Sequence, residues 1–244
     1  MIAILFGFIA AHLIGDFILQ SDKNAQLKFT AELPKKVEIL TVHSALQALL
    51  TYVFIAQWSA WPIPVIILLS HFAIDFFKVQ SGKRGLPAFL CDQFAHYVVI
   101  AVVWWAFFVR GVYPVAVHPL AASFLIKACA FIAVLVPVSV FIKLFLEYEK
   151  WIPNEPSLQG MPNAGRWIGF LERVLILTFI FSNNIDGIGF LLAAKSIFRF
   201  GELRRSKDVK VTEYVLIGTL LSFAAAILIG FGAEWISSIN NELV

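Results

Sequence analysis

Long apolar segments follow one another along almost the whole chain, separated by short stretches that contain charge, proline or glycine. Hydrophobic residues make up 60% of the 244 residues and charged residues only 14%, a composition too apolar for a water-soluble domain. A helix needs about 20 apolar residues to cross a membrane. The sequence therefore predicts an all-α, polytopic membrane protein with about eight transmembrane helices. We place these helices at residues 2–20, 39–57, 62–79, 87–109, 120–146, 166–182, 186–200 and 213–233.

The basic residues indicate how these helices are oriented. Eight crossings place both termini on one side of the membrane and four loops on the other, at residues 21–38, 80–86, 147–165 and 201–212. Of the 19 lysines and arginines, all but Arg110 and Lys127 lie in these loops or at the helix ends beside them. Because cytosolic loops are enriched in basic residues, we predict a multi-pass protein of the cell (plasma or inner) membrane with its N-terminus and C-terminus outside.

The longest predicted loop, residues 147–165, contains three prolines and separates two groups of spans. We predict an N-terminal transmembrane half at residues 1–146 with spans one to five, and a C-terminal half at residues 166–244 with spans six to eight. The net charge of +3 is small, and the basic residues lie between apolar segments, which argues against nucleic-acid binding. The lipid bilayer is the expected partner, and the oligomeric state stays open.

Three histidine–aspartate pairs occur inside the predicted spans at a spacing of four residues. Spans one, three and four contain the pairs His12/Asp16, His71/Asp75 and Asp92/His96, and span two adds His43. This spacing places both members of a pair on one helix face. Because consecutive spans run in opposite directions, all seven groups come to lie near the cytosolic ends of their helices. We therefore expect four helices to converge on one site.

Ionisable groups at this depth in a membrane are costly unless they pair or bind something. Mixed imidazole and carboxylate ligands suit zinc, manganese or ferrous iron, so the pattern predicts a divalent transition-metal site with one or two ions. All seven groups are candidate ligands, and Asp16, Asp75 and Asp92 are candidate catalytic residues because a carboxylate not bound to metal can act as general base. The alternative is a network of His–Asp hydrogen bonds that holds the four helices together.

The second half offers basic groups at a similar predicted depth. Arg173, Lys195 and Arg199 are candidates for binding a phosphate or an anionic lipid headgroup. Lys195 and Arg199 share a helix face because they are four residues apart. The alternative is that these side chains extend to the membrane surface, with Glu172 paired to Arg173 or Lys195.

Several segments also carry a family resemblance. In the first half they are AHLIGDFILQSD, the lone His43, HFAIDFFK and FLCDQFAHYVV, and in the second half GFLER, AAKSIFRF and EYVLIGTLLS. Together they resemble a bacterial integral-membrane family catalogued as domain of unknown function 3307, which implies no established activity. More distantly, the His/Asp arrangement is similar to that of membrane-bound metal-dependent hydrolases, although an adjacent Asp-His motif is missing. That resemblance implies metal-ligand roles by chemical analogy for His12, Asp16, His43, His71, Asp75, Asp92 and His96.

Three functions fit these observations. The first is a metal-dependent membrane hydrolase that acts on a phospho-compound or lipid-linked substrate at the cytosolic leaflet. The second is a metal-ion or proton-coupled transporter, which needs a polar path to the outer side. The third is a membrane anchor or sensor with a structural His/Asp or metal site. The outer halves of spans two to four are almost entirely apolar, which favours a site open to one side only.

Overall fold

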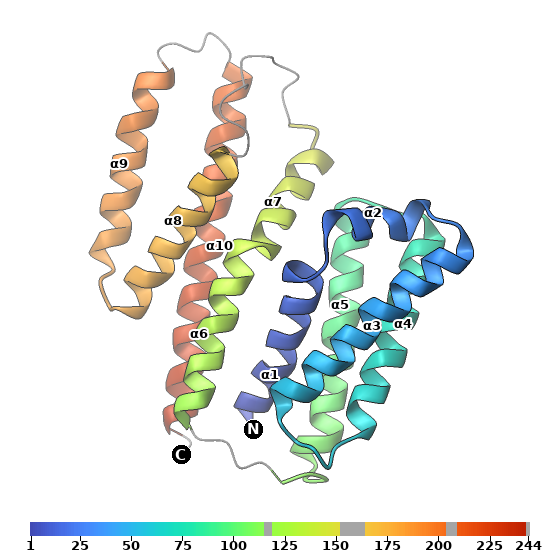
Figure 1. Ribbon diagram of the computed structural model, residues 1–244. Helices are drawn as coiled ribbons and strands as arrows, with labels where there is room; N and C mark the ends of the chain where they lie inside the picture. Colours follow the sequence, from blue (N-terminus) through green and yellow to red (C-terminus); the bar gives the residue numbers. More distant parts are fainter. Residues whose placement is uncertain (115–118, 152–163, 204–208, 243–244) are drawn as a thin grey trace. The chain divides into compact units, whose positions relative to one another are not determined.

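The computed structural model describes residues 1–114, 119–151, 164–203 and 209–242, and most of these residues are helical with no strand among them (Figure 1). Five helical segments of this part of the chain are long and apolar enough to cross a membrane, and a bent pair of helices, Ile2–Ile18 with Lys23–Thr30, makes up to six. The five are Leu33–Ile55, Pro62–Ser81, Leu86–Val109, Ala122–Tyr148 and Thr212–Asn240. The predicted class, a helical membrane protein, is confirmed, while the count of eight spans stays a prediction.

Residue contacts divide the chain into two compact units within α6, between Cys129 and Ala130. Unit 1 contains Met1–Cys129 and the end of the chain from Ile239, and unit 2 contains Ala130–Ser238. The predicted loop at 147–165 lies mostly outside the described residues, as does part of the loop at 201–212. The division into residues 1–146 and 166–244 therefore stays a prediction.

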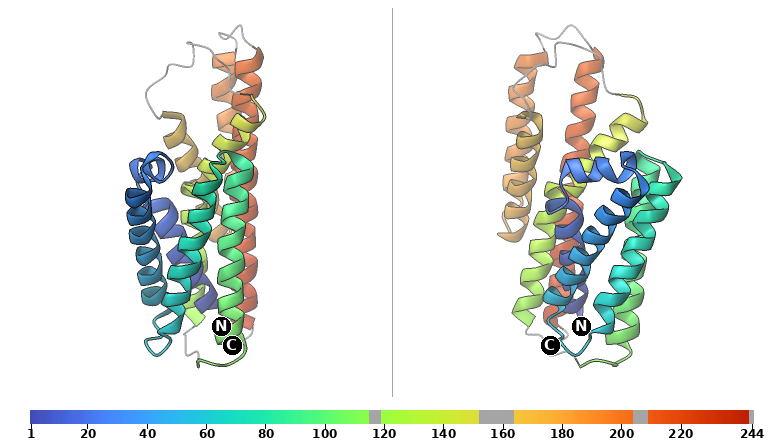
Figure 2. Two further views of the ribbon diagram at one scale, coloured as in Figure 1. Left: turned by 90° about the vertical axis from the view of Figure 1, so that its right-hand side faces the viewer. Right: turned by 45° about the vertical axis from the view of Figure 1, so that its right-hand side comes forward.

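Unit 1 is built on a bundle of four helices, in which consecutive helices run antiparallel (Figure 2). The chain forms α1 (Ile2–Leu13), which continues as a π-helical turn η1 (Ile14–Ile18), then α3 (Leu33–Ile55), α4 (Pro62–Ser81) and α5 (Leu86–Trp104). A second π-helical turn, η2 (Trp105–Val109), extends α5. Helix α1 packs against α3 and α5, and α4 packs against α3 and α5, so the four helices close into a ring.

Local sequence explains where these helices begin and end. Helices α3, α4 and α5 each have a proline in the first turn, where a missing N–H breaks no helical hydrogen bond. Helix α3 is followed by Ala56 and α4 by Gly82, and both of these residues have left-handed backbone angles that end the helix. These prolines and left-handed residues fix where the helices of the bundle begin and end, and the bundle in turn positions the polar cluster.

A short helix, α2 (Asp22–Thr30), replaces part of the loop predicted at 21–38. The hydroxyl of Ser21 caps it by accepting a hydrogen bond from the backbone N–H of Asn24. Helix α2 contacts α3 and α4 and lies across one end of the bundle (Figure 2). Unit 1 therefore has one end covered by a polar helix.

The apolar core of unit 1 fills the opposite end of the bundle. It contains residues from α1, α3, α4, α5 and η2, together with the connection before α4, and the side chains are almost fully buried. Its members are Ile4, Phe8, Ile55, Ala60, Ile63, Ile67, Ile100, Val103 and Phe108. The bundle thus has an apolar half and, toward α2, a polar half.

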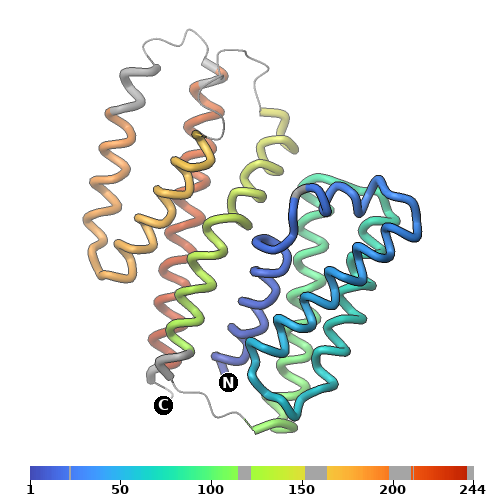
Figure 3. Tube along the Cα trace, viewed as in Figure 1, coloured from blue at the N-terminus to red at the C-terminus, as the bar shows by residue number. Residues whose placement is uncertain are grey.

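Unit 2 contains the remainder of α6 (Pro119–Leu135), α7 (Pro137–Tyr148), α8 (Ala164–Phe181), α9 (Asp186–Leu203) and most of α10 (Val209–Glu242). Helices α8 and α9 form a hairpin (Figure 3), and the turn between them contains Asn183, which has a positive φ. They lie where the sixth and seventh spans were predicted. Helices α6 and α7 meet at Val136 because Pro137 interrupts the helical hydrogen bonds.

Candidate metal centre

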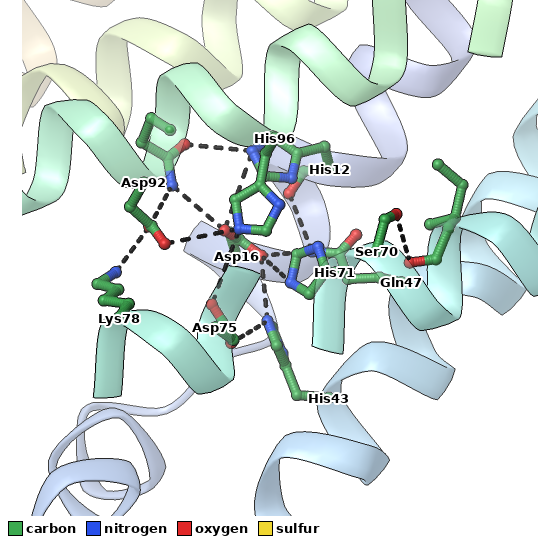
Figure 4. Close-up of polar contacts among 12 residues, drawn as sticks. His12, Asp16, His43, Gln47, Ser70, His71, Asp75, Lys78, Asp92 and His96 are labelled. Atoms are coloured by element: carbon green, nitrogen blue, oxygen red, sulfur yellow. Dashed lines mark hydrogen bonds and ion pairs between the residues drawn. The ribbon is translucent and has the colours of Figure 1, made fainter. Parts of the chain in front are cut away.

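The seven predicted ligands meet inside unit 1, in the half of the bundle that α2 covers (Figure 4). One histidine comes from each of α1, α3, α4 and α5, and the aspartates come from η1, α4 and α5. The side chains of all seven groups are less than one tenth exposed. They are His12, Asp16, His43, His71, Asp75, Asp92 and His96.

The four imidazoles form a continuous row. The rings of His71 and His96 stack with their centroids 4.1 Å apart and an interplanar angle of 23°. His43 lies beside His71 at 4.9 Å, and His12 lies beside His96 at 5.1 Å. Four rings from four helices therefore share one small volume.

Asp16 is positioned by the π-helical turn at the end of α1. The backbone N–H of Leu19 bonds to Ile14 O at 2.9 Å, five residues back, which widens this turn relative to an α-helix. One carboxylate oxygen of Asp16, Oδ1, lies 3.1 Å from His43 Nε2 and accepts a hydrogen bond from Gln47 Nε2 at 2.5 Å. π-helical turns of this kind occur frequently at functional sites.

Glycine at position 15 makes the contact between Asp16 and Gln47 possible. A Cβ atom at Gly15 would overlap the side-chain amide of Gln47. The second oxygen of Asp16, Oδ2, accepts a hydrogen bond from Gln93 Nε2 at 3.3 Å, and Gln93 Oε1 lies 3.2 Å from His12 Nε2. Two amide side chains therefore hold Asp16 in a fixed orientation.

Asp75 and Asp92 are arranged alike around His96. Each turns its Oδ1 atom toward His96 Nε2, at 3.7 Å in both cases. Each turns its Oδ2 atom to a lysine: Lys28 Nζ donates to Asp75 at 2.5 Å, and Lys78 Nζ donates to Asp92 at 2.6 Å. Lys28 comes from α2 and is itself buried, so α2 is tied to α4 by a buried ion pair.

Several ligand atoms of the cluster have no hydrogen-bond partner among the described residues. They are His71 Nε2, His96 Nε2 and Asp92 Oδ1, all of which are fully shielded from solvent. A buried polar atom without a partner costs about 1–3 kcal/mol. His96 Nε2 lies 3.7 Å from Asp92 Oδ1, and the His96 ring stacks on that of His71. A bound cation is one partner that unpaired ligand atoms of this kind can take.

Three groups in this part of the chain can hold a metal ion, each with its ligand atoms within 4.8 Å of one another. They are His12/His71/His96, Asp16/His43/His71 and Asp75/Asp92/His96. A cavity of about 20 Å³ adjoins them, enough for one water molecule. Its lining consists of His12, Gln47, Thr51, Ile67, Ser70, His71, His96, Val99 and Ile100.

Sequence reasoning missed four polar residues of the site. Gln47 lies four residues after His43, so a search that included amides at helical spacing would have found it, and Gln93 directly follows Asp92. Lys78 was assigned only to the basic helix ends. Lys28 had no local signal, because α2 was predicted as a loop and its contact with Asp75 depends on tertiary structure.

The predicted anion-binding residues of the second half do not form one free cationic group. Arg173 is buried, and its guanidinium donates to the carbonyls of Val134 and Leu135, at 2.5 and 3.3 Å, beside the break before Pro137. It also donates to the hydroxyls of two serines, Ser139 and Ser222. Arg173 thus binds carbonyl groups in the last turn of α6, where a helix end leaves carbonyls without helical partners.

Lys195 forms an ion pair with Glu172 at 2.5 Å, which matches the alternative interpretation of these charges. Its Nζ atom also lies 5.4 Å from the centroid of the Phe223 ring. Arg199 belongs to α9, but its side chain lies outside the described residues. Anion binding in the second half therefore stays a prediction.

The fold and this site define a class: a helical membrane protein with a buried His/Asp cluster that can hold a metal ion. Residues 4–125, half of the chain and nearly all of unit 1, match the family described as "Protein of unknown function (DUF3307)", and the chain belongs to this family. No curated protein and no solved structure has significant similarity to the chain. The family match covers every member of the His/Asp cluster.

Proposed function

We propose that this protein is a metal-dependent membrane hydrolase whose His/Asp cluster binds a divalent transition metal. The observation that supports this most directly is the meeting of buried imidazole and carboxylate side chains in groups that can hold a metal ion, with His71 Nε2 left without a hydrogen-bond partner. A purely structural network would be expected to satisfy its own buried polar atoms. Zinc, manganese and ferrous iron suit this mixture of nitrogen and oxygen ligands.

Hydrolysis is the simplest chemistry for such an ion. A divalent metal activates a bound water molecule and polarises a phosphoryl or carbonyl oxygen. The small cavity beside His12, His71 and His96 has room for that water. Asp16, Asp75 and Asp92 lie against the histidines that line this cavity, and a carboxylate among them that is not bound to the ion can accept a proton.

The end of the bundle from which a substrate can reach the cluster is basic, which favours an anionic substrate. The apolar core closes the bundle at the end opposite α2, so a polar substrate has to approach from the end that α2 covers. Exposed basic residues lie on α2 and at the helix ends there, namely Lys23, Lys35, Lys83 and Arg84. Such a surface attracts phosphates and anionic lipids. We therefore propose a phospho-compound or lipid-linked substrate at the cytosolic leaflet.

The same basic residues support the proposed topology. We assign the protein to the cell membrane, with the α2 end of unit 1 in the cytosol and both termini outside. Arg173 is not part of the proposed substrate site, because its donors are bound to backbone carbonyls and serines.

One observation favours a second candidate, a structural or sensory role. Lys28 and Lys78 neutralise two of the three carboxylates without any metal ion. Such an arrangement can persist as a self-contained network that ties α2 to the bundle. Transport has less support, because the apolar core blocks a polar path through unit 1.

The test is turnover by purified protein in lipid nanodiscs, loaded in turn with zinc, manganese and ferrous iron. Phosphomonoesters, phosphodiesters and polyprenyl phosphates are supplied, and released phosphate or alcohol is measured. We expect metal-dependent hydrolysis that His71→Ala abolishes and that Cys91→Ser, at an exposed position beside Asp92, leaves unchanged. Metal-loaded protein without turnover on any of these substrates would support the structural role instead.

A further inference from the structure

The three possible metal groups cannot all be occupied together. His71 belongs to two of them and His96 to two, and the geometry around each uses a single ring nitrogen, Nε2. One nitrogen binds one ion at a time. The only two groups without a shared residue are Asp16/His43/His71 and Asp75/Asp92/His96. The ligands therefore allow either one ion or a pair of ions in these two groups.

Charge distinguishes the two groups. In the second group, each carboxylate already has an ammonium group on its Oδ2 atom, at 2.5 Å for Asp75 and 2.6 Å for Asp92. The Lys28–Asp75 pair is buried on both sides, where charges interact more strongly than in water. A dication between these two carboxylates would face two ammonium groups, and this group has no net negative charge to hold it.

Asp16 is in the opposite situation. Among the described residues it contacts only imidazoles and the amides of Gln47 and Gln93, and no lysine or arginine lies against it. Its charge is the only uncompensated carboxylate charge of the cluster. Two histidines and one carboxylate are also a ligand set that zinc hydrolases and ferrous enzymes use. His71 and Gln47 both border the cavity, which leaves space for a water molecule at an open position.

We infer that the centre binds one divalent ion, held by Asp16, His43 and His71, and that Lys28 and Lys78 take the place of a second ion beside Asp75 and Asp92. This inference rests on the proposed metal-dependent function and specifies its ligands and its stoichiometry. Lysine Nζ atoms on the Oδ2 atoms also hold both Oδ1 atoms toward His96. The lysines thereby set the number of ions that the cluster accepts.

The first test counts ions in two matched variants. Purified protein is titrated with Zn²⁺ or Mn²⁺, and bound metal is measured after removal of free metal. We expect one equivalent in the wild type, less than 0.1 equivalent in Asp16→Asn and about one equivalent in Asp92→Asn. Both substitutions replace a buried carboxylate by its amide, so they differ in position alone. Loss of the ion from Asp92→Asn with retention in Asp16→Asn would overturn the assignment.

The second test removes the two ammonium groups. We expect Lys28→Met/Lys78→Met to bind two equivalents, with an exchange-coupled Mn²⁺ spectrum in place of the isolated-ion spectrum of the wild type. Lys23→Met/Lys83→Met removes the same charge from exposed positions and should still bind one equivalent. A single equivalent in the first variant would overturn the role of the lysines. If that variant does not fold, Lys78→Met alone is the substitute, because the Lys78 side chain is 28% exposed.

The results separate this inference from the proposed function. Two equivalents in the wild type would overturn the single-ion assignment and leave metal-dependent hydrolysis intact. No bound ion in the folded wild type would overturn both proposals. One ion that depends on Asp16, without hydrolysis of any substrate, would support the site and remove the enzymatic role.

Discussion

The imidazole rings of His71 and His96 stack with their centroids 4.1 Å apart, although they come from different helices, α4 and α5. Neither Nε2 atom makes a hydrogen bond within the described residues, and both are buried. Two imidazoles at this distance cannot both be protonated without strong repulsion in a medium of low dielectric constant. At least one of the two rings is therefore neutral, the form in which histidine binds metals.

The ion pair between Lys28 and Asp75 should stabilise the position of α2. Lys28→Met leaves the Asp75 carboxylate buried without an ammonium group, and we expect the free energy of unfolding of the metal-free protein to fall by about 3 kcal/mol. Asp75→Asn in the same chain should restore most of this loss, because no charge is then left unpaired. Tryptophan fluorescence during unfolding in mixed micelles measures both effects. Lys23→Met, at an exposed position on α2, is the control, and an equal loss in it would contradict the account.

Gly15 should resist substitution even by alanine. Alanine in a helix is normally more stable than glycine by about 1 kcal/mol, but at position 15 its Cβ would displace Gln47 from Asp16. We expect Gly15→Ala to lower thermal stability and to weaken metal binding about tenfold, the usual scale for losing a supporting hydrogen bond. Gly232→Ala, in α10 with open space around the added atom, should leave metal affinity unchanged. Unchanged affinity in Gly15→Ala would show that Gln47 does not position Asp16.

Arg173 should be essential for stability in unit 2. Lysine at this position keeps the charge but cannot reach the carbonyls of Val134 and Leu135 and the two serine hydroxyls together. We expect Arg173→Lys to reduce the free energy of unfolding by about 3 kcal/mol, because buried acceptors lose a charged donor. Thermal unfolding beside Arg166→Lys, an exposed arginine of α8, measures the difference. Equal stability of the two variants would contradict the structural role of Arg173 and make anion binding the better explanation of its charge.

The proposed topology gives opposite expectations for two reporters. Alkaline phosphatase, which is active only outside the cytosol, should be active when fused after Val244, and green fluorescent protein should be dark there. Inserted at Gly82, between α4 and α5, green fluorescent protein should instead fluoresce. Fluorescence of the C-terminal fusion would place that terminus in the cytosol and contradict the orientation.

The convergence of the seven His and Asp groups could be predicted because it needs only helical spacing and alternating span direction. Both are properties of the sequence itself once the apolar segments are assigned as helices. The π-helical turn that positions Asp16 could not be predicted in this way, because the spacing argument assumed regular α-helix from His12 to Asp16. The pairing partner of Asp75 could not be predicted either, because Lys28 is 47 residues away in a helix that has no strong apolar periodicity.

The interpretation of Arg173 illustrates a related limit. An arginine near an expected membrane surface suggested anion binding, and the predicted span at residues 120–146 placed Pro137 inside one continuous helix. The contact that joins them is set by the packing of α8 against the junction of α6 and α7. Because Arg173 lies far along the sequence from the junction of α6 and α7, its structural role there could not be predicted from the sequence.

The most direct test of the account is the metal content of the purified wild-type protein, measured by mass spectrometry after loading and removal of free metal. His71→Ala/His43→Ala and Cys91→Ser are measured beside it, and size-exclusion chromatography confirms that each variant is folded. We expect bound zinc, manganese or iron in the wild type and in Cys91→Ser, and loss of the metal from the double variant. Equal metal content in all three proteins, or none in the folded wild type, would contradict the central claim that the cluster is a metal centre.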